Sequence, residues 1–136
     1  MPLPEFRHCL ICEEVRQEKR RLLSLLGVYG IAPDVEILVR DFAKPVGRLA
    51  FVLFGNQGGD RFKAVFRILS ENREPIVTSP EVEDAAQESR HYNIAVAIEG
   101  LTLPGPGKYT FELLLHGRTS FTTQFQARQG REDDFD

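Results

Sequence analysis

The sequence contains no tryptophan, only two cysteines and no excess of basic residues. The absence of tryptophan removes one common anchor for sugars and cations. Lysine and arginine contribute 17 positive charges against 20 acidic side chains, so the formal net charge is -3. Because a protein binds a polyanion by neutralising its phosphates with a basic patch, this balance argues against a nucleic-acid partner.

Long apolar segments are also missing. No run approaches the roughly 20 residues that a membrane-spanning helix needs, so we expect no membrane partner. Residues 1–14 carry two prolines and early charges, and they lack the small-residue cleavage site of a signal peptide. We therefore expect a cytoplasmic location, in which both cysteines stay reduced.

The hydrophobic content is sufficient for one folded domain. Of the 136 residues, 42% are hydrophobic, and ten are phenylalanine. A chain of this length buries about two-thirds of its unfolded surface without needing disulfide or metal support. We expect a single domain over residues 1–128, followed by an acidic, flexible tail over residues 129–136.

Apolar residues alternate with polar ones along the C-terminal half, which is typical of strands with one buried face. In residues 108–116 the alternating apolar side chains are Tyr109, Phe111, Leu113 and Leu115. The same alternation returns in residues 119–128, after a short glycine-containing connection, so the two runs predict a hairpin. Further strand candidates occupy residues 34–42, 47–55, 61–70 and 92–100.

The segments between these candidates carry turn signals. Residues 103–107 (LPGPG) cannot continue a helix or a central strand. Tyr109 follows them, as in the corner of many sandwich folds, where a tyrosine hydrogen-bonds to the preceding backbone. Ser79 and Pro80 precede several acidic residues and predict a possible short helix near residues 80–89. The whole pattern predicts an all-β fold, an antiparallel β-sandwich of the Ig-like or C2-like kind with about eight strands.

Residues 12–30 allow two interpretations. As a helix, this stretch has good intrinsic propensity, but the four leucines of residues 22–26 would surround most of its circumference. As a hairpin, it follows a first strand whose expected common face consists of Phe6, His8, Leu10 and Cys12. Residues 13–20 then form the connection. We favour the hairpin, and a helix stays the alternative.

A Cys-x-x-Val-Arg-x-Glu segment and a later Ser-Leu-x-Gly segment lie in this stretch. Their residues are Cys12, Val15, Arg16, Glu18, Ser24, Leu25 and Gly27. Together they resemble the opening of an uncharacterised family of small bacterial proteins, a domain of unknown function. The resemblance implies a compact β-sandwich in which the charged segment links two strands, and it implies no activity. The sequence departs from the family pattern at residues 19–21, where Lys-Arg-Arg replaces an expected glycine.

Cys9 and Cys12 form a C-x-x-C pair inside the first apolar run. In an extended strand their side chains point to opposite faces, about 10 Å apart along the chain, too far to share a metal ion or a disulfide. We therefore expect two buried thiols and no metal. A metal or redox pair is the alternative, and it requires a bend at residues 10–11.

Catalytic signatures are missing as well. The three histidines, His8, His91 and His116, are dispersed, and no nucleophile, metalloprotease or phosphate-loop motif is present. A catalytic base needs a partner within hydrogen-bond reach, and no spacing in the sequence indicates one. We therefore assign no catalytic residue and expect no cofactor.

Residues 47–55 are apolar on both faces of the predicted strand, although one face of an antiparallel sheet is normally polar. One set of alternating residues would fill the core, which leaves Ala50, Val52 and Phe54 facing outward. Either the 79–90 segment or the N-terminal segment covers this second face, or the face forms an interface with a partner.

These observations predict a non-enzymatic protein-interaction or assembly module that binds a protein partner or associates with itself as a homodimer. Its candidate interaction residues are Val52 and Phe54 on the sheet, and Arg16 and Glu18 in the densest charged cluster. The alternative is a small-ligand-binding protein or an enzyme with a loop-built site near Arg16, Glu18 and His91.

Overall fold

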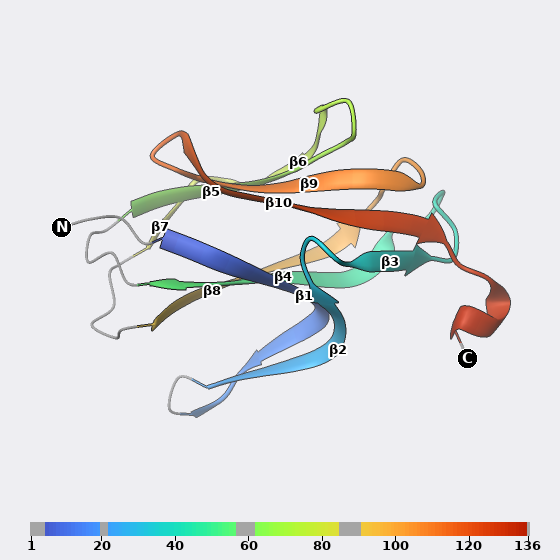
Figure 1. Ribbon diagram of the computed structural model, residues 1–136, viewed down its shortest axis with the longest axis horizontal. Helices are drawn as coiled ribbons and strands as arrows, with labels where there is room; N and C mark the ends of the chain where they lie inside the picture. Colours follow the sequence, from blue (N-terminus) through green and yellow to red (C-terminus); the bar gives the residue numbers. More distant parts are fainter. Residues whose placement is uncertain (1–4, 20–21, 57–61, 85–90, 136) are drawn as a thin grey trace.

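The computed structural model describes residues 5–19, 22–56, 62–84 and 91–135. Two β-sheets face each other across one core and form a sandwich (Figure 1). This architecture confirms the predicted all-β class. The described residues form ten strands, a larger number than expected.

The first sheet contains four strands in the order β2-β1-β4-β8. Its strands are β1 (Glu5–Gln17), β2 (Leu23–Ile31), β4 (Val46–Asn56) and β8 (His91–Leu101). Every neighbouring pair in this sheet is antiparallel. β2 and β8 therefore form its two edges.

The second sheet follows the order β3-β10-β9-β5-β6, and the short β7 also pairs with β5. Its strands are β3 (Glu36–Val39), β5 (Phe62–Leu69), β6 (Pro75–Thr78), β7 (Val82–Asp84), β9 (Gly107–Leu115) and β10 (Arg118–Gln129). The pairing is antiparallel except between β3 and β10, which run parallel. β6 and β7 pair with different parts of β5, so together they form one edge of this sheet.

The main core lies between the sheets and consists of side chains that alternate along the strands, as a period of two requires. Phe51 of β4 and Phe111 of β9 are completely buried, and their rings stack with centroids 4.4 Å apart. The ring of Phe125 from β10 lies 5.6 Å from that of Phe51. Aromatic rings from both sheets therefore meet at the centre of the sandwich and join the two layers.

The C-terminal hairpin is confirmed, since β9 ends at Leu115 and β10 begins at Arg118. Between them, His116 and Gly117 adopt φ angles of 51° and 76°. Positive φ at both central residues is the requirement of a type I′ turn, whose twist matches that of the flanking strands.

The predicted tyrosine corner is also confirmed. The Tyr109 hydroxyl accepts a hydrogen bond from the Gly105 amide at 3.2 Å and donates one to the Gly105 carbonyl. The phenol thus satisfies two backbone groups in a proline-rich corner that cannot pair them within a sheet.

The leucine-rich stretch forms the second strand of a hairpin, so the helix alternative is wrong. β1 and β2 pair from Gln17 opposite Leu23 to Leu10 opposite Ile31. The connection expected over residues 13–20 is too long, because residues 14–17 pair with β2 and belong to β1.

The side-chain alternation of β1 differs from the expected one. Its register against β4 shifts between Phe6 and His8, which turns the following side chains to the other face. Phe6, Cys9 and Ile11 consequently lie in the main core. The prediction that His8 and Leu10 share the face of Phe6 is therefore wrong.

The helix expected near residues 80–89 is absent from its described part, residues 80–84. A strand, β7, pairs with β5 there, and residues 85–90 lie outside the described residues. The Ser79 hydroxyl accepts a hydrogen bond from the Phe66 amide at 2.9 Å, and the Ser79 amide donates to the Phe66 carbonyl at 2.9 Å. Ser79 therefore binds the backbone of β5 and does not cap a helix.

The C-terminal residues continue the fold past the expected boundary at residue 128. β10 extends to Gln129, and a short 3-10 helix covers Glu132–Phe135. The Arg40 guanidinium lies 4.6 Å from the centre of the Phe135 ring. Phe135 therefore folds back against the residue that follows β3.

Candidate functional site

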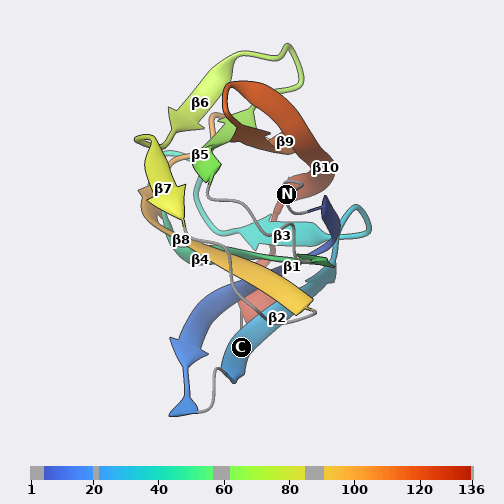
Figure 2. The ribbon, with the colours of Figure 1, turned by 90° about the vertical axis from the view of Figure 1, so that its left-hand side faces the viewer.

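The distal half of the β1–β2 hairpin, residues 13–17 and 23–28, forms an arm that leaves the sandwich (Figure 1). Figure 2 shows the arm passing below β4 and β8, on the side of the first sheet that faces away from the second. The arm covers a second apolar cluster. Its fully buried members are Cys12, Ala50 and Val52, and the arm contributes Val15, Leu23 and Leu25. The N-terminal segment thus covers the second face of β4.

This arrangement corrects the position expected for Val52. Its side chain is 0% exposed, so it has no surface to offer a partner. Phe54 is half-buried against the same cluster. Both residues pack the arm against the sheet, and an accessible interaction surface has to be sought elsewhere.

Arg16 and Glu18 lie at the end of the arm, and both bond to residues of the same hairpin. Arg16 Nε lies 3.6 Å from Glu14 Oε1. Glu18 Oε1 accepts a hydrogen bond from Ser24 Oγ at 3.1 Å. His91 instead begins β8, beside the last residue of β4. The structure therefore keeps Arg16 and Glu18 on one hairpin and places His91 on another strand, and the exposed contacts of Arg16 and Glu18 contribute little to stability.

Cys9 and Cys12 lie on opposite faces of β1, as their spacing predicted. Cys9 belongs to the main core and Cys12 to the cluster under the arm, and both are free thiols. Burial, with a smaller effect of Cys12, raises the pKa of Cys9 from 9.0 to about 12. Burial also raises the pKa of Cys12. The two thiols are therefore protonated at neutral pH. No group of three His, Cys, Asp or Glu side chains in the described ranges could hold a metal ion.

The raised pKa of Cys9 predicts a loss of stability in alkaline solution. The unfolded chain releases this proton near pH 9, whereas the folded chain holds it until about pH 12. Unfolding therefore releases protons in this window, and the free energy of unfolding falls as pH rises, by up to about 1.4 kcal/mol per pH unit. Urea unfolding between about pH 9 and about pH 11 should give a steeper decline for wild type than for Cys9→Val. Equal slopes would contradict the role of this thiol.

The two edges of the first sheet differ in regularity. Along β2, Gly27 and Gly30 adopt φ angles of 64° and 148°, and the register against β1 shifts. Irregularities of this kind disfavour pairing with another chain. On or beside β2 lie the exposed large hydrophobic residues Leu22, Leu26, Val28 and Ile31. β2 thus combines an exposed apolar surface with an irregular edge.

β8 is the more regular edge over residues 91–99. Its register against β4 is constant from His91 opposite Asn56 to Glu99 opposite Arg48, and its one glycine with positive φ, Gly100 (72°), follows this segment. Residues 94–98 (IAVAI) contain no charge, no proline and no glycine. Charges, prolines and bulges are the devices that usually protect an edge from further pairing. Residues 94–98 carry none of these devices, and among the described strands only β4 pairs with them.

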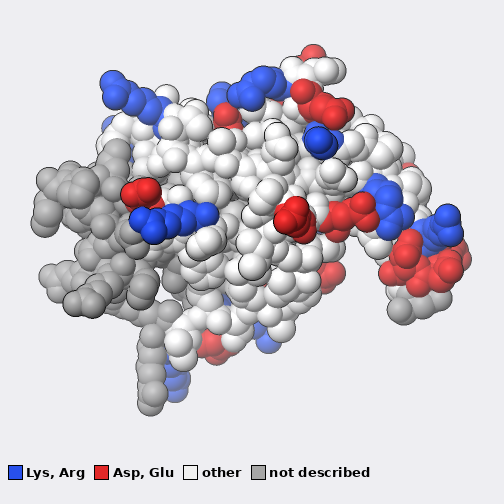
Figure 3. Space-filling model, in the orientation of Figure 1, with Lys and Arg blue, Asp and Glu red and all other residues white. Residues whose placement is uncertain are grey.

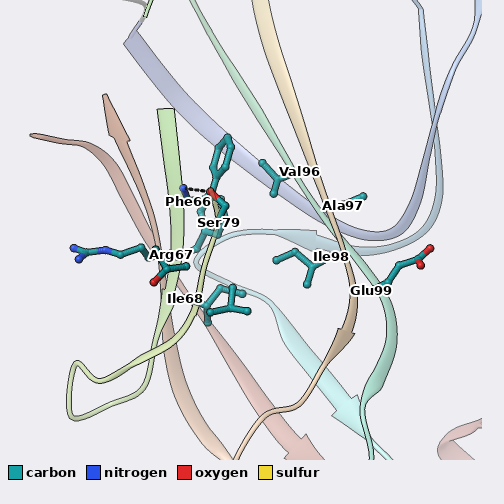
Figure 4. A pocket seen from close by; sticks show the side chains of 11 residues that line it. Phe66, Arg67, Ile68, Ser79, Val96, Ala97, Ile98 and Glu99 are labelled. Atoms are coloured by element: carbon teal, nitrogen blue, oxygen red, sulfur yellow. Dashed lines mark hydrogen bonds between the residues drawn. The ribbon is translucent and has the colours of Figure 1, made fainter. Parts of the chain in front are cut away.

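A slot opens between this edge and the second sheet, with a volume of about 260 Å³. Apolar side chains of four strands line it, namely Phe66, Ile68, Val77, Val96, Ile98 and Phe111. Figure 4 shows that Val96 and Ile98 point toward the side of Phe66 and Ile68, whereas Ala97 and Glu99 point away. One face of β8 thus contributes directly to the slot.

The slot exists because the sandwich is incomplete on this side. Ile94, Val96 and Ile98 of β8 pack against the main core but are only half-buried. Phe51 and Leu53 of the neighbouring β4 face the same core and are completely buried. The opposing β6 is only four residues long. A further strand beside β8 would therefore bury apolar surface that the chain leaves partly exposed.

Three of the four polar side chains that line the slot, those of Arg67, Ser79 and Glu99, have other contacts. Arg67 Nη2 lies 2.6 Å from Glu112 Oε1 on the second sheet. Arg48 Nε lies 3.7 Å from Glu99 Oε1 on the first sheet. The Ser79 hydroxyl bonds to backbone groups as both acceptor and donor. The slot therefore offers an apolar surface, and its lining residues include no histidine or lysine that could activate a nucleophile.

The edge position of β8 was missed in the sequence. The alternation of residues 92–100 predicted a strand, but the order of strands in a sheet depends on residues far apart in the chain. The only feature of the sequence that could have indicated an open edge is what residues 94–98 lack, namely charge, proline and glycine. Such a run is equally compatible with a central strand, so only the topology identifies it as an edge.

The surface charges do not form a binding patch on the face drawn in Figure 3. Basic and acidic side chains are mostly neighbours there, and basic atoms also border the acidic group at the C-terminal end. Within the described residues, no helix has the length and apolar character needed to cross a membrane.

No family model and no curated protein matches the sequence. One similar solved structure is alkylpurine DNA glycosylase AlkC of Pseudomonas fluorescens bound to DNA with an abasic-site analogue, at 10% identity, a TM-score of 0.45, and 71% coverage of this chain and 28% of that one. A glycosyl hydrolase family 2 member from Bacteroides cellulosilyticus gives 11% identity, a TM-score of 0.44, and 76% and 17% coverage. An immunoglobulin-like protein from Pseudomonas aeruginosa gives 14% identity, a TM-score of 0.38, and 87% and 91% coverage. The chain thus spans less than a third of the first two proteins, and the likeness concerns the fold alone.

Proposed function

We propose that the chain is a non-enzymatic protein-interaction module that binds an extended protein segment as an added strand at β8. The observation that carries the proposal is the regular, uncharged edge of residues 94–98 beside an apolar slot. In strand addition, main-chain hydrogen bonds supply affinity, and alternate side chains enter pockets that supply specificity. β8 offers both features on the same side of the sandwich.

The position of the slot beside the edge of β8 and its apolar lining favour the side chains of a docked strand over a free ligand. A strand paired with β8 directs every second side chain into the layer of Val96 and Ile98. Aliphatic residues at alternate positions are therefore the expected preference.

The polar groups around the slot support binding without catalysis. Nucleophilic catalysis requires a nucleophile together with a base and a group that orients the base. The Ser79 hydroxyl is held by backbone groups, and the other lining residues include no histidine, lysine or cysteine. The proposed module therefore acts by binding alone.

Peptides selected from a displayed random library provide the probe for this function. We expect them to carry alternating aliphatic residues and to bind the full chain with dissociation constants in roughly the micromolar range. Val96→Lys should weaken this binding at least about tenfold, because an inward-pointing lysine at a sheet edge blocks a further strand. Fluorescence anisotropy of labelled peptides measures the change.

Ala97→Lys is the matched control, because it adds the same charge to the same strand on the side that points away from the slot. It should change the affinity by less than about threefold. Equal binding by wild type and Val96→Lys would count against strand addition at β8. If both lysines weakened binding equally, the added charge alone would explain the loss. That result would also count against strand addition at β8.

A further inference from the structure

We infer that the strand added at β8 comes from a second copy of this chain, whose own β8 pairs antiparallel with it about a twofold axis. The inference rests on the proposed function of this edge and names its partner. The product is a homodimer in which two four-stranded sheets join into one continuous sheet.

The central part of β8 reads Asn-Ile-Ala-Val-Ala-Ile-Glu and is nearly symmetrical about Val96. When Val96 lies opposite Val96 of the second copy, Ile94 lies opposite Ile98. In the same register, Ala95 lies opposite Ala97. Branched aliphatic side chains then meet on the slot side, and alanines meet on the outer side. The segment is therefore complementary to itself in the antiparallel direction.

The charge of this segment fits the same register. Glu99 is its one charged residue, and Glu99 Oε1 lies 3.7 Å from Arg48 Nε within the chain. In the register centred on Val96, Glu99 lies opposite Asn93 of the second copy. The two Glu99 carboxylates then lie at opposite ends of the paired segment, which avoids a destabilising like-charge pair.

Twofold pairing also explains why an unprotected edge would lead to a dimer and not to an aggregate of many copies. The contact occupies both β8 edges at once, so it closes at two copies. The other edge, β2, is interrupted by Gly27 and Gly30 with positive φ, which disfavours extension of the joined sheet. One strand pair is a small interface, so we expect a dissociation constant of roughly 10–100 µM.

Two double variants test the contact directly. A double-lysine variant carries Ala95→Lys and Ala97→Lys, and a double-glutamate variant carries Ala95→Glu and Ala97→Glu. Both positions are exposed, so each variant should fold like the wild type. Each variant alone places like charges opposite each other in the paired register. An equimolar mixture of the two variants places opposite charges there.

Sedimentation velocity of the full chain from about 5 µM to about 500 µM provides the readout. We expect the wild type to dimerise in this range and each double variant to associate at least about tenfold more weakly. The mixture should regain at least the wild-type association. A Gln124→Lys, Gln126→Lys variant adds the same charge to exposed positions of β10 and should dimerise like the wild type.

Several results would overturn the inference. The wild type could stay monomeric, the double variants could dimerise unchanged, or the mixture could fail to restore association. Loss of association in Val28→Lys, with the double variants unaffected, would place the contact at β2 instead. If the wild type is monomeric while selected peptides bind and depend on Val96, the second-copy inference fails and the proposed function stands. If peptide binding and self-association are both absent, both proposals fail.

Discussion

Replacing Gly55 by alanine is expected to lower the free energy of unfolding by about 3 kcal/mol or more. Gly55 of β4 lies opposite Phe6, where the register of β1 shifts. A Cβ atom at Gly55 would lie 2.7 Å from Phe6 Cα and would also collide with the carbonyl oxygen of Glu5. Both obstacles are backbone atoms of the neighbouring strand, so β1 and β4 must separate to admit one methyl group.

Gly47→Ala is the matched control, because Gly47 lies in the same strand and a Cβ atom there has no neighbour within 4 Å. It should change the free energy of unfolding by no more than about 0.5–1 kcal/mol. Urea unfolding followed by circular dichroism measures both variants. If the two alanines cost the same, the close approach of β1 to Gly55 is wrong.

The second large effect is expected for Phe111→Ala, at about 3–5 kcal/mol. Phe111 is completely buried, and its ring stacks on Phe51 at 4.4 Å and lies 6.1 Å from Phe66. Its removal leaves a cavity between the two sheets that the surrounding rings cannot fill. Thermal and urea unfolding, with the same denaturant slope as wild type, should report this loss.

Phe121→Ala is the control, because it removes the same aromatic side chain from a position that is only half-buried. Phe121 lies on β10 and is half-buried against the main core. We expect a cost of about 1–2 kcal/mol, because less apolar surface returns to water and the site is open to solvent. A cost for Phe111→Ala no larger than this would show that Phe111 is not central to the packing of the two sheets.

The features that the sequence predicted correctly depend on residues close together in the chain. The β9–β10 hairpin follows from alternation and from His116 and Gly117 in its turn. The tyrosine corner follows from Tyr109 just after a proline-rich corner, and its hydroxyl needs to reach only Gly105. Local geometry determines such contacts, so local patterns reveal them.

The features that were missed depend on contacts between distant segments. The register shift between Phe6 and His8 arises where β1 meets β4, and no pattern within β1 marks it. Val52 looked like an outward-facing residue because the arm that covers it belongs to the N-terminal hairpin. Ser79 and Pro80 form a local pattern typical of a helix start, but Ser79 bonds to Phe66 of β5, a residue distant in the sequence. In each case tertiary pairing outweighed a valid local preference.

The candidate site illustrates the same division. Alternation identified β8 as a strand and showed which of its residues face the core, but not which strand lies beside it. Its edge position follows from the sheet order, and the slot follows from the short β6 on the opposing layer. A surface made by the absence of a neighbouring strand leaves little trace in the sequence itself.

We propose that residues 94–98 of β8 form an open edge that accepts another strand. Amide hydrogen exchange of the full chain, resolved by residue and compared with and without saturating selected peptide, tests it most directly. We expect amides of β8 that are not bonded to β4 to exchange rapidly in dilute solution and to become protected when the peptide binds, while amides of β2 keep their rates. Unchanged exchange in β8, or new protection confined to β2, would rule out strand addition at β8.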